Sequence, residues 1–252
     1  MINSQYKAIA LGSFDGLHLG HKKVISKTIE LSKSKHISSL VFNIDKNTNK
    51  KLIQNDDKEE ILKKIGVDLF YNIGLKEICH LDGYDFINEV IINKLKAKAI
   101  CCGFNYRFGN NAKYDVNDLK DICSQKEVEL YVVPPVFYQN ILISSTRIRN
   151  FIEAGNICSA NALLGYKFFI NFNVCEENVY DSSLIIKQIL ENDFIIPKAG
   201  TYQSTACIDK EYNCITKIIN KNELVIAETK IFDYNKPNLI NRKIKIEFLK
   251  NN

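Results

Sequence analysis

KAIALGSFDGLHLGHKKVISKTIELSKS, residues 7–34, is the stretch of sequence that predicts the fold most directly. Its first six residues are a nearly continuous apolar run, as a strand buried in a parallel sheet requires. From about residue 20 to residue 34 the apolar side chains recur with the period of a helix. Gly12 and Gly16 lie in the turn between these segments. The stretch therefore predicts a strand, a glycine turn and a helix.

The same alternation continues through the first half of the chain. Further short apolar runs predict strands at residues 38–43, 68–73, 97–103 and 129–133. Helix-period segments lie between them, at about residues 57–65, 84–95 and 114–126. Strands and helices in this order indicate an α/β fold with a doubly wound parallel sheet, which binds ligands at the carboxyl ends of its strands.

After Tyr166 the sequence pattern changes from alternating strands and helices to strands alone. An apolar helical stretch, Ile157–Leu164, runs into Gly165, which suits a helix C-terminus. Beyond it, strand-like runs separated by turn residues lie at 168–175, 201–208, 213–219, 223–232 and 243–249. We therefore predict two domains, an α/β domain of residues 1–166 and a small all-β domain of residues 167–252.

Composition limits the classes of partner. Of 252 residues, 46% are hydrophobic and 25% are charged, and 34 Lys and Arg against 29 Asp and Glu leave a net charge of +5. That charge is slight and dispersed, so a nucleic acid partner is not expected. No apolar run approaches the ~20 residues that span a bilayer, and the first residues carry no secretion signal, so we expect no membrane partner and a cytoplasmic protein. The oligomeric state is left open.

Eight cysteines are present without any C-x-x-C pair. They fall mostly in apolar stretches, so we expect reduced core residues. Cys101 and Cys102 are adjacent in a predicted strand and should point to opposite faces of the sheet.

The first strand-to-helix turn, LGSFDGLHLGH at residues 11–21, carries the clearest chemistry. Its glycines let a ligand approach the backbone, and the helix start offers free N–H groups and a positive dipole end to phosphate. His18 and His21 are three residues apart and share one face of a helical turn, which Gly20 keeps open. Two imidazoles there can donate hydrogen bonds to the charge that develops in phosphoryl transfer.

Other interpretations of this turn fit less well. A Walker loop needs G-x-x-x-x-G-K-[ST], which does not follow Gly16, and the serine of GSFDG is in the wrong place for a G-x-S-x-G elbow. A zinc site needs a third ligand. Nothing brings His36 or His80 there, and both are predicted to be surface residues. A glycine turn with two surface histidines remains the alternative.

Two further segments follow predicted strands. GFNYRFG, residues 103–109, alternates aromatic and polar side chains and could contact a planar, phosphorylated ligand. It could equally be a hydrophobic loop that packs under the sheet. ISSTRIR, residues 143–149, can begin a helix capped by Ser144 or Ser145, with Ser145 and Arg149 on one face. Its alternative is a capped helix with solvated arginines.

Together the three segments resemble the HxGH nucleotidyltransferases, and within them the adenylyltransferase half of bacterial bifunctional riboflavin kinase/FAD synthetases. The resemblance covers about residues 7–166, including the helical tail GNICSANALLGY. It implies a Rossmann-like doubly wound parallel sheet followed by a small β-barrel-like domain. It also implies transfer of the adenylyl group of ATP to FMN, giving FAD and pyrophosphate, with Mg²⁺ accompanying ATP.

The resemblance assigns roles to matching positions. His18 and His21 would stabilise charge on the α-phosphoryl group and the leaving pyrophosphate, and Arg149 would act with them while holding ATP. The remaining ATP-binding positions would be Gly12, Phe14, Asp15, Gly16, Ser145 and Thr146. The positions towards the flavin phosphate and ring would be Asn105, Arg107 and Phe108. No residue is assigned as a metal ligand.

The sequence departs from the family in two places. The family has F-x-P-H-P near the flavin after its second strand, whereas residues 42–47 here are FNIDKN. The kinase half of the family has a glycine-rich phosphate cradle, whereas residues 167–196 contain no glycine, proline or threonine. Only PKAGTY (197–202) and ETKIFDY (228–234) resemble that half, and they would put Glu228 in the position of its general base.

We therefore expect FAD synthesis without riboflavin kinase activity. Three alternatives stay open: a bifunctional enzyme, an adenylyltransferase for another phosphorylated acceptor, and a nucleotide- or flavin-sensing module without catalysis.

Overall fold

The computed structural model describes residues 5–46, 50–180, 183–190, 193–221, 224–234, 236 and 238–251. The chain divides into two compact units. The first comprises residues 1–48 and 53–143, and the second comprises residues 49–52 and 144–252.

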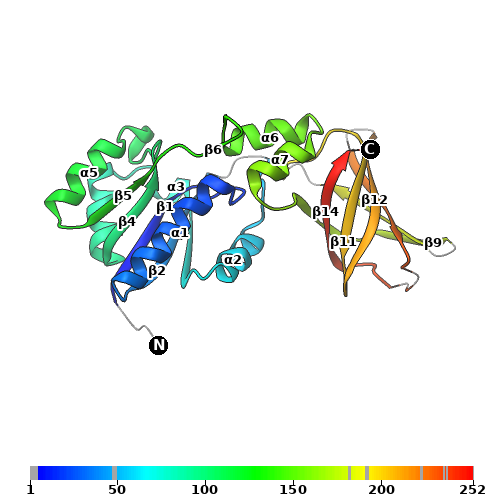
Figure 1. Cartoon of the computed structure of the whole chain (residues 1–252), viewed down its shortest axis with the longest axis horizontal. Helices are drawn as coiled ribbons and strands as arrows, with labels where there is room; N and C mark the ends of the chain where they lie inside the picture. Colours follow the sequence, from blue (N-terminus) through cyan, green and yellow to red (C-terminus); the bar gives the residue numbers. More distant parts are fainter. Residues whose placement is uncertain are drawn as a thin grey trace. The chain divides into compact units, whose positions relative to one another are not determined.

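The first unit contains a five-stranded parallel sheet with the strand order β3-β2-β1-β4-β5 (Figure 1). The strands are β1 (Lys7–Gly12), β2 (Ser38–Asp45), β3 (Leu69–Gly74), β4 (Ala97–Gly103) and β5 (Glu129–Val133). All five lie where the apolar runs predict them. The order reverses between β1 and β4, so the crevice at their carboxyl ends is the expected ligand site of such a sheet.

Helical segments connect these strands. They are α1 (Leu19–Ser34), α2 (Asn55–Lys64), α3 (Leu75–Ile78), α4 (Gly83–Asp85), the π-helical η1 (Phe86–Lys94), the short 3₁₀ turn η2 (Asn110–Ala112) and α5 (Val116–Gln125). The sequence predicts the four longer stretches but not α3, which is too short to show a period. A two-stranded hairpin, β6 (Phe137–Tyr138) and β7 (Ile141–Leu142), follows β5.

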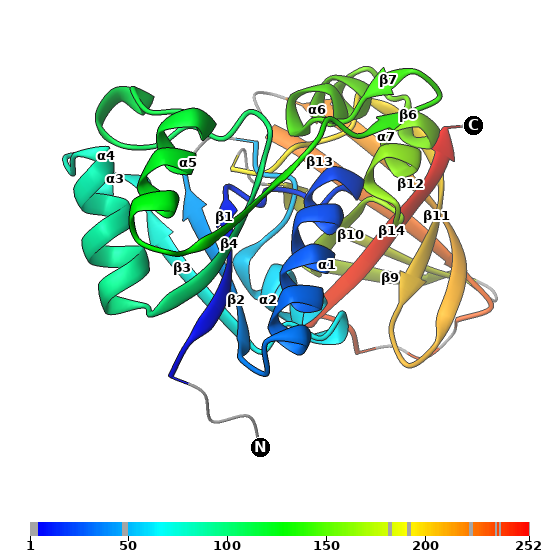
Figure 2. The same ribbon diagram turned by 60° about the vertical axis from the view of Figure 1, so that its left-hand side comes forward.

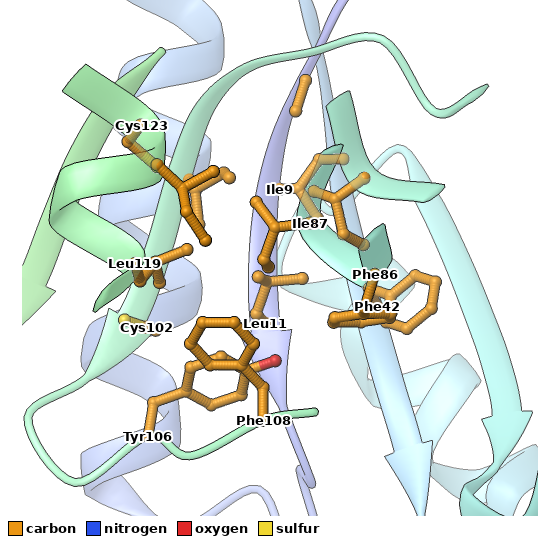
Figure 3. Close-up of a cluster of buried hydrophobic side chains, with 14 of the residues drawn as sticks. Ile9, Leu11, Phe42, Phe86, Ile87, Cys102, Tyr106, Phe108, Leu119 and Cys123 are labelled. Atoms are coloured by element: carbon orange, nitrogen blue, oxygen red, sulfur yellow. The ribbon is translucent and has the colours of Figure 1, made fainter. Parts of the chain in front are cut away.

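The two faces of this sheet bury different side chains. Ile9 and Leu11 of β1 join a cluster that also contains residues of η1 and α5, such as Ile87 and Leu119 (Figure 3). Cys102 lies in the same cluster, whereas the neighbouring thiol of Cys101 contacts Thr28 of α1. The prediction that these two cysteines point to opposite faces is confirmed.

The second unit contains two helices and an antiparallel sheet (Figure 2). The helices are α6 (Ser145–Glu153) and α7 (Ile157–Leu164). The strand order is β8-β14-β11-β12-β13-β10-β9. The strands are β8 (Phe169–Asn173), β9 (Glu176–Tyr180), β10 (Ser183–Leu190), β11 (Gly200–Cys207), β12 (Glu211–Lys221), β13 (Leu224–Phe232) and β14 (Lys243–Asn251). The α/β fold with a following barrel-like β sheet is as predicted, but the sequence did not predict β9 and β10.

Helix α7 packs on the second sheet. The Asn161 side chain donates to the Phe248 carbonyl of β14 at 2.9 Å and accepts from the Phe168 backbone at 2.7 Å. Gly165 ends α7 in the left-handed conformation, with φ of 69°, as the sequence predicts. These contacts place the division between the units at residues 143/144, whereas the predicted boundary is 166/167.

The cysteine prediction is only half right. All eight are free thiols, but Cys79, Cys158 and Cys175 are exposed and Cys207 is half-buried. The buried four are Cys101, Cys102, Cys123 and Cys214. Burial raises the pKa of the Cys101 thiol to about 11, which disfavours its thiolate form. No helix among the described residues is long and apolar enough to cross a membrane.

Candidate functional site

The turn after β1 is bent by residues in the left-handed backbone region. Gly16 has φ of 84°, which favours glycine, and Leu17 follows with φ of 41°. A Cβ on Gly12 would lie only 3.2 Å from the Phe14 ring. The turn therefore brings the chain sharply from the end of β1 to the start of α1, at the carboxyl edge of the sheet.

His18 is the N-cap of α1. Its Nδ1 accepts a hydrogen bond from the His21 backbone N–H at 3.2 Å. Because Nδ1 is an acceptor, the neutral ring carries its proton on Nε2. The cap therefore fixes both the orientation of this imidazole and its tautomer, and leaves Nε2–H as the donor that could meet a ligand.

The two histidines form one stack. Their ring centroids are 3.6 Å apart with nearly parallel planes, and the Phe14 ring meets His21 edge-on at 5.3 Å. A Cβ on Gly20 would lie 3.2 Å from both Cε1 and Nδ1 of His18. Glycine at this position therefore leaves the space that the His18 ring occupies, as predicted from the sequence.

Both imidazoles are neutral at neutral pH. Burial lowers the pKa of His18 to about 4, against an opposing backbone hydrogen bond. Burial, the neighbouring His18 and the charge of Lys58 lower the pKa of His21 well below its usual value. The His21 Nδ1 atom is buried and has no hydrogen-bond partner among the described residues. The pair therefore offers neutral N–H groups rather than a resting positive charge.

A polar cluster beside the histidines was not predicted. Asn43, at the end of β2 and 1% exposed, accepts from the Phe14 backbone N–H at 2.9 Å through its Oδ1. The same oxygen accepts from the Lys58 ammonium at 3.3 Å. Asn43 lies in the FNIDKN segment that replaces F-x-P-H-P. A polar side chain within an apolar strand is the sequence feature that could have identified Asn43. Lys58 lies in the charged run NDDKEEILKK, so no sequence feature distinguishes it from its neighbours.

The GFNYRFG loop divides into core and surface. Tyr106 and Phe108 are 9% and 4% exposed, and the Phe108 ring packs between Tyr106 and Tyr114. The Phe108 ring thus packs in the core of this loop, and its expected position towards the flavin phosphate and ring stays a prediction. Asn105 and Arg107 are exposed, and Arg107 Nε donates to the Ala112 carbonyl at 2.9 Å.

The ISSTRIR segment begins α6 in the second unit. Ser144, rather than Ser145, is the N-cap and accepts from the Arg147 backbone N–H at 3.3 Å. Ser145 is the first helical residue, and Thr146 is exposed. Arg149 is half-buried, with Nε donating to the Lys50 carbonyl at 3.0 Å, whereas Arg147 is exposed.

The structure thus gathers the predicted residues in two groups. The turn after β1 brings together Gly12, Phe14, Asp15, Gly16, His18 and His21. The start of α6 carries Ser145, Thr146 and Arg149. His36 and His80 are exposed, as predicted. Within the described part of the chain, no group of three or more His, Cys, Asp or Glu side chains could hold a metal ion.

Comparison with known sequences shows the family of the chain. The sequence profile of the FAD synthetases matches residues 2–147. A bifunctional riboflavin kinase/FMN adenylyltransferase of Buchnera aphidicola (subspecies Schizaphis graminum) is 31% identical over 188 residues, which are 70% of this chain. The match covers 60% of that relative's length. An FAD synthetase of Listeria monocytogenes is 27% identical, with 82% of this chain and 84% of the relative covered.

Comparison with solved structures shows a shared fold. A crystal structure described as a macrolide-efflux protein from Streptococcus pneumoniae superposes with a TM-score of 0.85 at 25% identity. The superposition covers 97% of this chain and 84% of the other. No activity follows from this likeness of fold.

Proposed function

Because the chain belongs to the FAD synthetase family, we propose that it transfers the adenylyl group of ATP to the phosphate of FMN. An oxygen of the FMN phosphate forms a bond to the α-phosphorus of ATP, and the bond from that phosphorus to the bridging oxygen of pyrophosphate breaks. The products are FAD and pyrophosphate. We expect this reaction in the cytoplasm.

The observation that carries the proposal is the histidine stack at the start of α1. His18 is oriented by its N-cap hydrogen bond, and His21 is held against it at a ring distance of 3.6 Å. Their N–H groups would donate to the non-bridging oxygens of the α-phosphoryl group and to the leaving pyrophosphate, where charge develops. The attacking phosphate is already an anion, so no general base and no covalent intermediate are needed.

Other residues would bind and orient the substrates. The glycine turn, with Asp15, would contact ATP through its backbone, while Ser145, Thr146 and Arg149 would hold the nucleotide phosphates. Asn105 and Arg107, which are exposed, would lie towards FMN. Mg²⁺ would arrive with ATP and be held chiefly by phosphate oxygens, where it neutralises charge.

The experiment is incubation of the purified protein with Mg·ATP and FMN, followed by chromatography of the flavins and measurement of pyrophosphate. FAD and pyrophosphate are expected in equal amounts. A His18→Asn, His21→Ala double variant is the matched control for contaminating activity. Failure of the wild-type protein to form FAD would contradict the proposal.

A second acceptor is the main competing proposal. It is favoured by one observation, the FNIDKN segment where the family has F-x-P-H-P. In that case ATP labelled on its α-phosphate would be consumed with other phosphorylated metabolites but would not label FAD. The same assay therefore separates the two acceptors.

We also propose that the second unit has no riboflavin kinase activity. Residues 169–190 supply strands β8, β9 and β10 where the family has its glycine-rich phosphate cradle. Glu228 lies opposite Lys217 on β12, and its carboxylate is 3.8 Å from the Lys187 ammonium. In this proposal Glu228 would contribute cross-strand charge pairing rather than act as a general base.

A further inference from the structure

Asn43 is a buried polar side chain in a mostly apolar strand. It lies near the end of β2, between Phe42 and Ile44, and is 1% exposed. Burying an amide costs free energy unless its donor and its acceptor are hydrogen-bonded, and asparagine is disfavoured in strands. An apolar residue would fill this position in the sheet without that cost. The amide therefore calls for a reason beyond packing.

Both ends of this amide are hydrogen-bonded. Nδ2 donates to Asn72 Oδ1 on the neighbouring strand β3, where Asn72 is the register partner of Asn43. Oδ1 accepts from the Phe14 backbone N–H at 2.9 Å. Phe14 lies two residues beyond the end of β1, whose last residue, Gly12, is the register partner of Asn43 on that side. The amide thus ties the turn after β1 to both β2 and β3.

Ring contacts lead from Phe14 to the histidines. The Phe14 side chain is 1% exposed, and a Cβ on Gly12 would approach its ring to 3.2 Å. The ring meets His21 edge-on at 5.3 Å, and His21 stacks on His18 at 3.6 Å. The position of the Phe14 backbone therefore limits where the His21 ring can lie.

We propose that Asn43 is a positioning residue: its Oδ1 holds the Phe14 backbone so that the Phe14 ring keeps His21 in place. The inference rests on the proposed function and deepens it, because Asn43 acts through Phe14 and not on the substrates. Donors that stabilise a transition state must be held in place before the reaction, and a displacement of about 1 Å can lower a rate on the order of 100-fold. Asn72 supports this role by fixing the Nδ2 end of the amide.

The first test compares kcat for FAD formation in Asn43→Leu and Asn43→Asp. Leucine has the branched shape of asparagine but no acceptor, so we expect kcat to fall about 10- to 100-fold while KM for ATP and for FMN stays nearly unchanged. Aspartate keeps an acceptor oxygen within reach of the Phe14 N–H. The Lys58 ammonium, which donates to Asn43 Oδ1 at 3.3 Å, would face the new charge. We therefore expect Asn43→Asp to recover most of kcat.

Ser39→Ala is the matched control. Ser39 is also 1% exposed on β2 and its hydroxyl donates to the Asp68 carboxylate at 2.7 Å, but it lies at the end of the strand away from the turn. We expect Ser39→Ala to lower the unfolding midpoint and to leave kcat unchanged. Wild-type kcat in Asn43→Leu, or an equal loss of kcat in the leucine and aspartate variants, would overturn the inference. If Asn43→Leu does not fold, Asn43→Ser takes its place with the same outcomes, because its hydroxyl lies one bond nearer the backbone and reaches less far.

The second test does not depend on FAD formation. In protein labelled with ¹⁵N-histidine, the imidazole signals of His18 and His21 should move in Asn43→Leu relative to wild type, whereas those of the two exposed histidines should not. Unmoved His21 signals would overturn the inference. Moved signals in a protein whose wild type forms no FAD would support the positioning of the histidines by Asn43 and contradict the proposed function.

Discussion

At the scale of single residues, His18 has two roles that substitution can separate. Its ring caps α1, and in the proposed reaction its Nε2–H would donate to a substrate. Asparagine is among the best N-caps, so His18→Asn should keep the cap and lose the imidazole donor, whereas alanine would cost about 1 kcal/mol of stability as well. We expect turnover to fall about 10²- to 10³-fold in His21→Ala and somewhat less in His18→Asn.

The measurements are kcat for FAD formation and the thermal unfolding midpoint. Lys23→Ala, an exposed position on the same helix, is the control. Unchanged turnover in both histidine variants would reject their catalytic role.

Burial of the His18 ring also makes the stability of the protein depend on pH. The pKa is about 4 in the folded protein against an ordinary 6.5, so between these values the unfolded chain binds more protons here. His18 therefore contributes on the order of 3 kcal/mol to the free energy of unfolding above about pH 6.5. This contribution is lost as pH falls through about 4. We expect the unfolding midpoint to drop less steeply from pH 7 to pH 4 in His18→Asn than in wild type. Parallel curves would argue against this assignment.

Arg149 and Arg147 should differ in their effect on ATP. Arg149 lies on the same helix face as Ser145 and is half-buried, whereas Arg147 is exposed. We expect Arg149→Ala to weaken ATP use by about 1.5 to 3 kcal/mol, measured as kcat/KM, and Arg147→Ala to have little effect. Arg149→Ala also removes the hydrogen bond to the Lys50 carbonyl, and the unfolding midpoint of the variant shows whether this loss destabilises the protein. A greater loss in Arg147→Ala would show that the helix face is misassigned.

At the scale of the element, Gly20 in the first turn of α1 leaves space for the His18 ring and lowers the helix propensity of that turn. Ala at a helical position normally stabilises by about 1 kcal/mol relative to Gly. At Gly20, however, the new Cβ would lie 3.2 Å from two atoms of the His18 ring, which must shift. We expect Gly20→Ala to lower turnover at least about 10-fold with the fold intact, checked by kcat and circular dichroism. Ser26→Ala, exposed on the same helix, should leave turnover unchanged.

The elements also show which parts of the fold are locally encoded. The first unit's strands are continuous apolar runs, and its long helices show a clear period, so their residues alone predict them. Strands β9 and β10 were missed because residues 176–190 mix charged and apolar side chains. Pairing of β10 with β13, and of β9 with β10, defines these strands. Tertiary pairing overrides a weak local pattern there.

At the scale of the whole molecule, one chain contains a nucleotidyltransferase-like unit and a β unit without a recognisable phosphate cradle. Phosphoryl transfer depends on positioning and charge neutralisation, which bulky side chains along residues 169–190 do not provide. We expect the protein to convert FMN to FAD but not riboflavin to FMN. Flavin chromatography after incubation with riboflavin and Mg·ATP checks this, with FMN as the parallel positive control. Steady FMN production would show a working kinase.

The sequence by itself determined the βαβ order, the histidine pair, the glycine that opens its turn and the family resemblance, because these depend on residues adjacent along the chain. The tertiary structure decided the rest. Burial makes His18 and His21 neutral, turns Phe108 into the core and leaves three cysteines exposed. Packing of α2 against the ends of β2 and β3 brings the Lys58 ammonium to Asn43. Burial and contacts between distant segments arise only when the chain folds, so no local pattern records them.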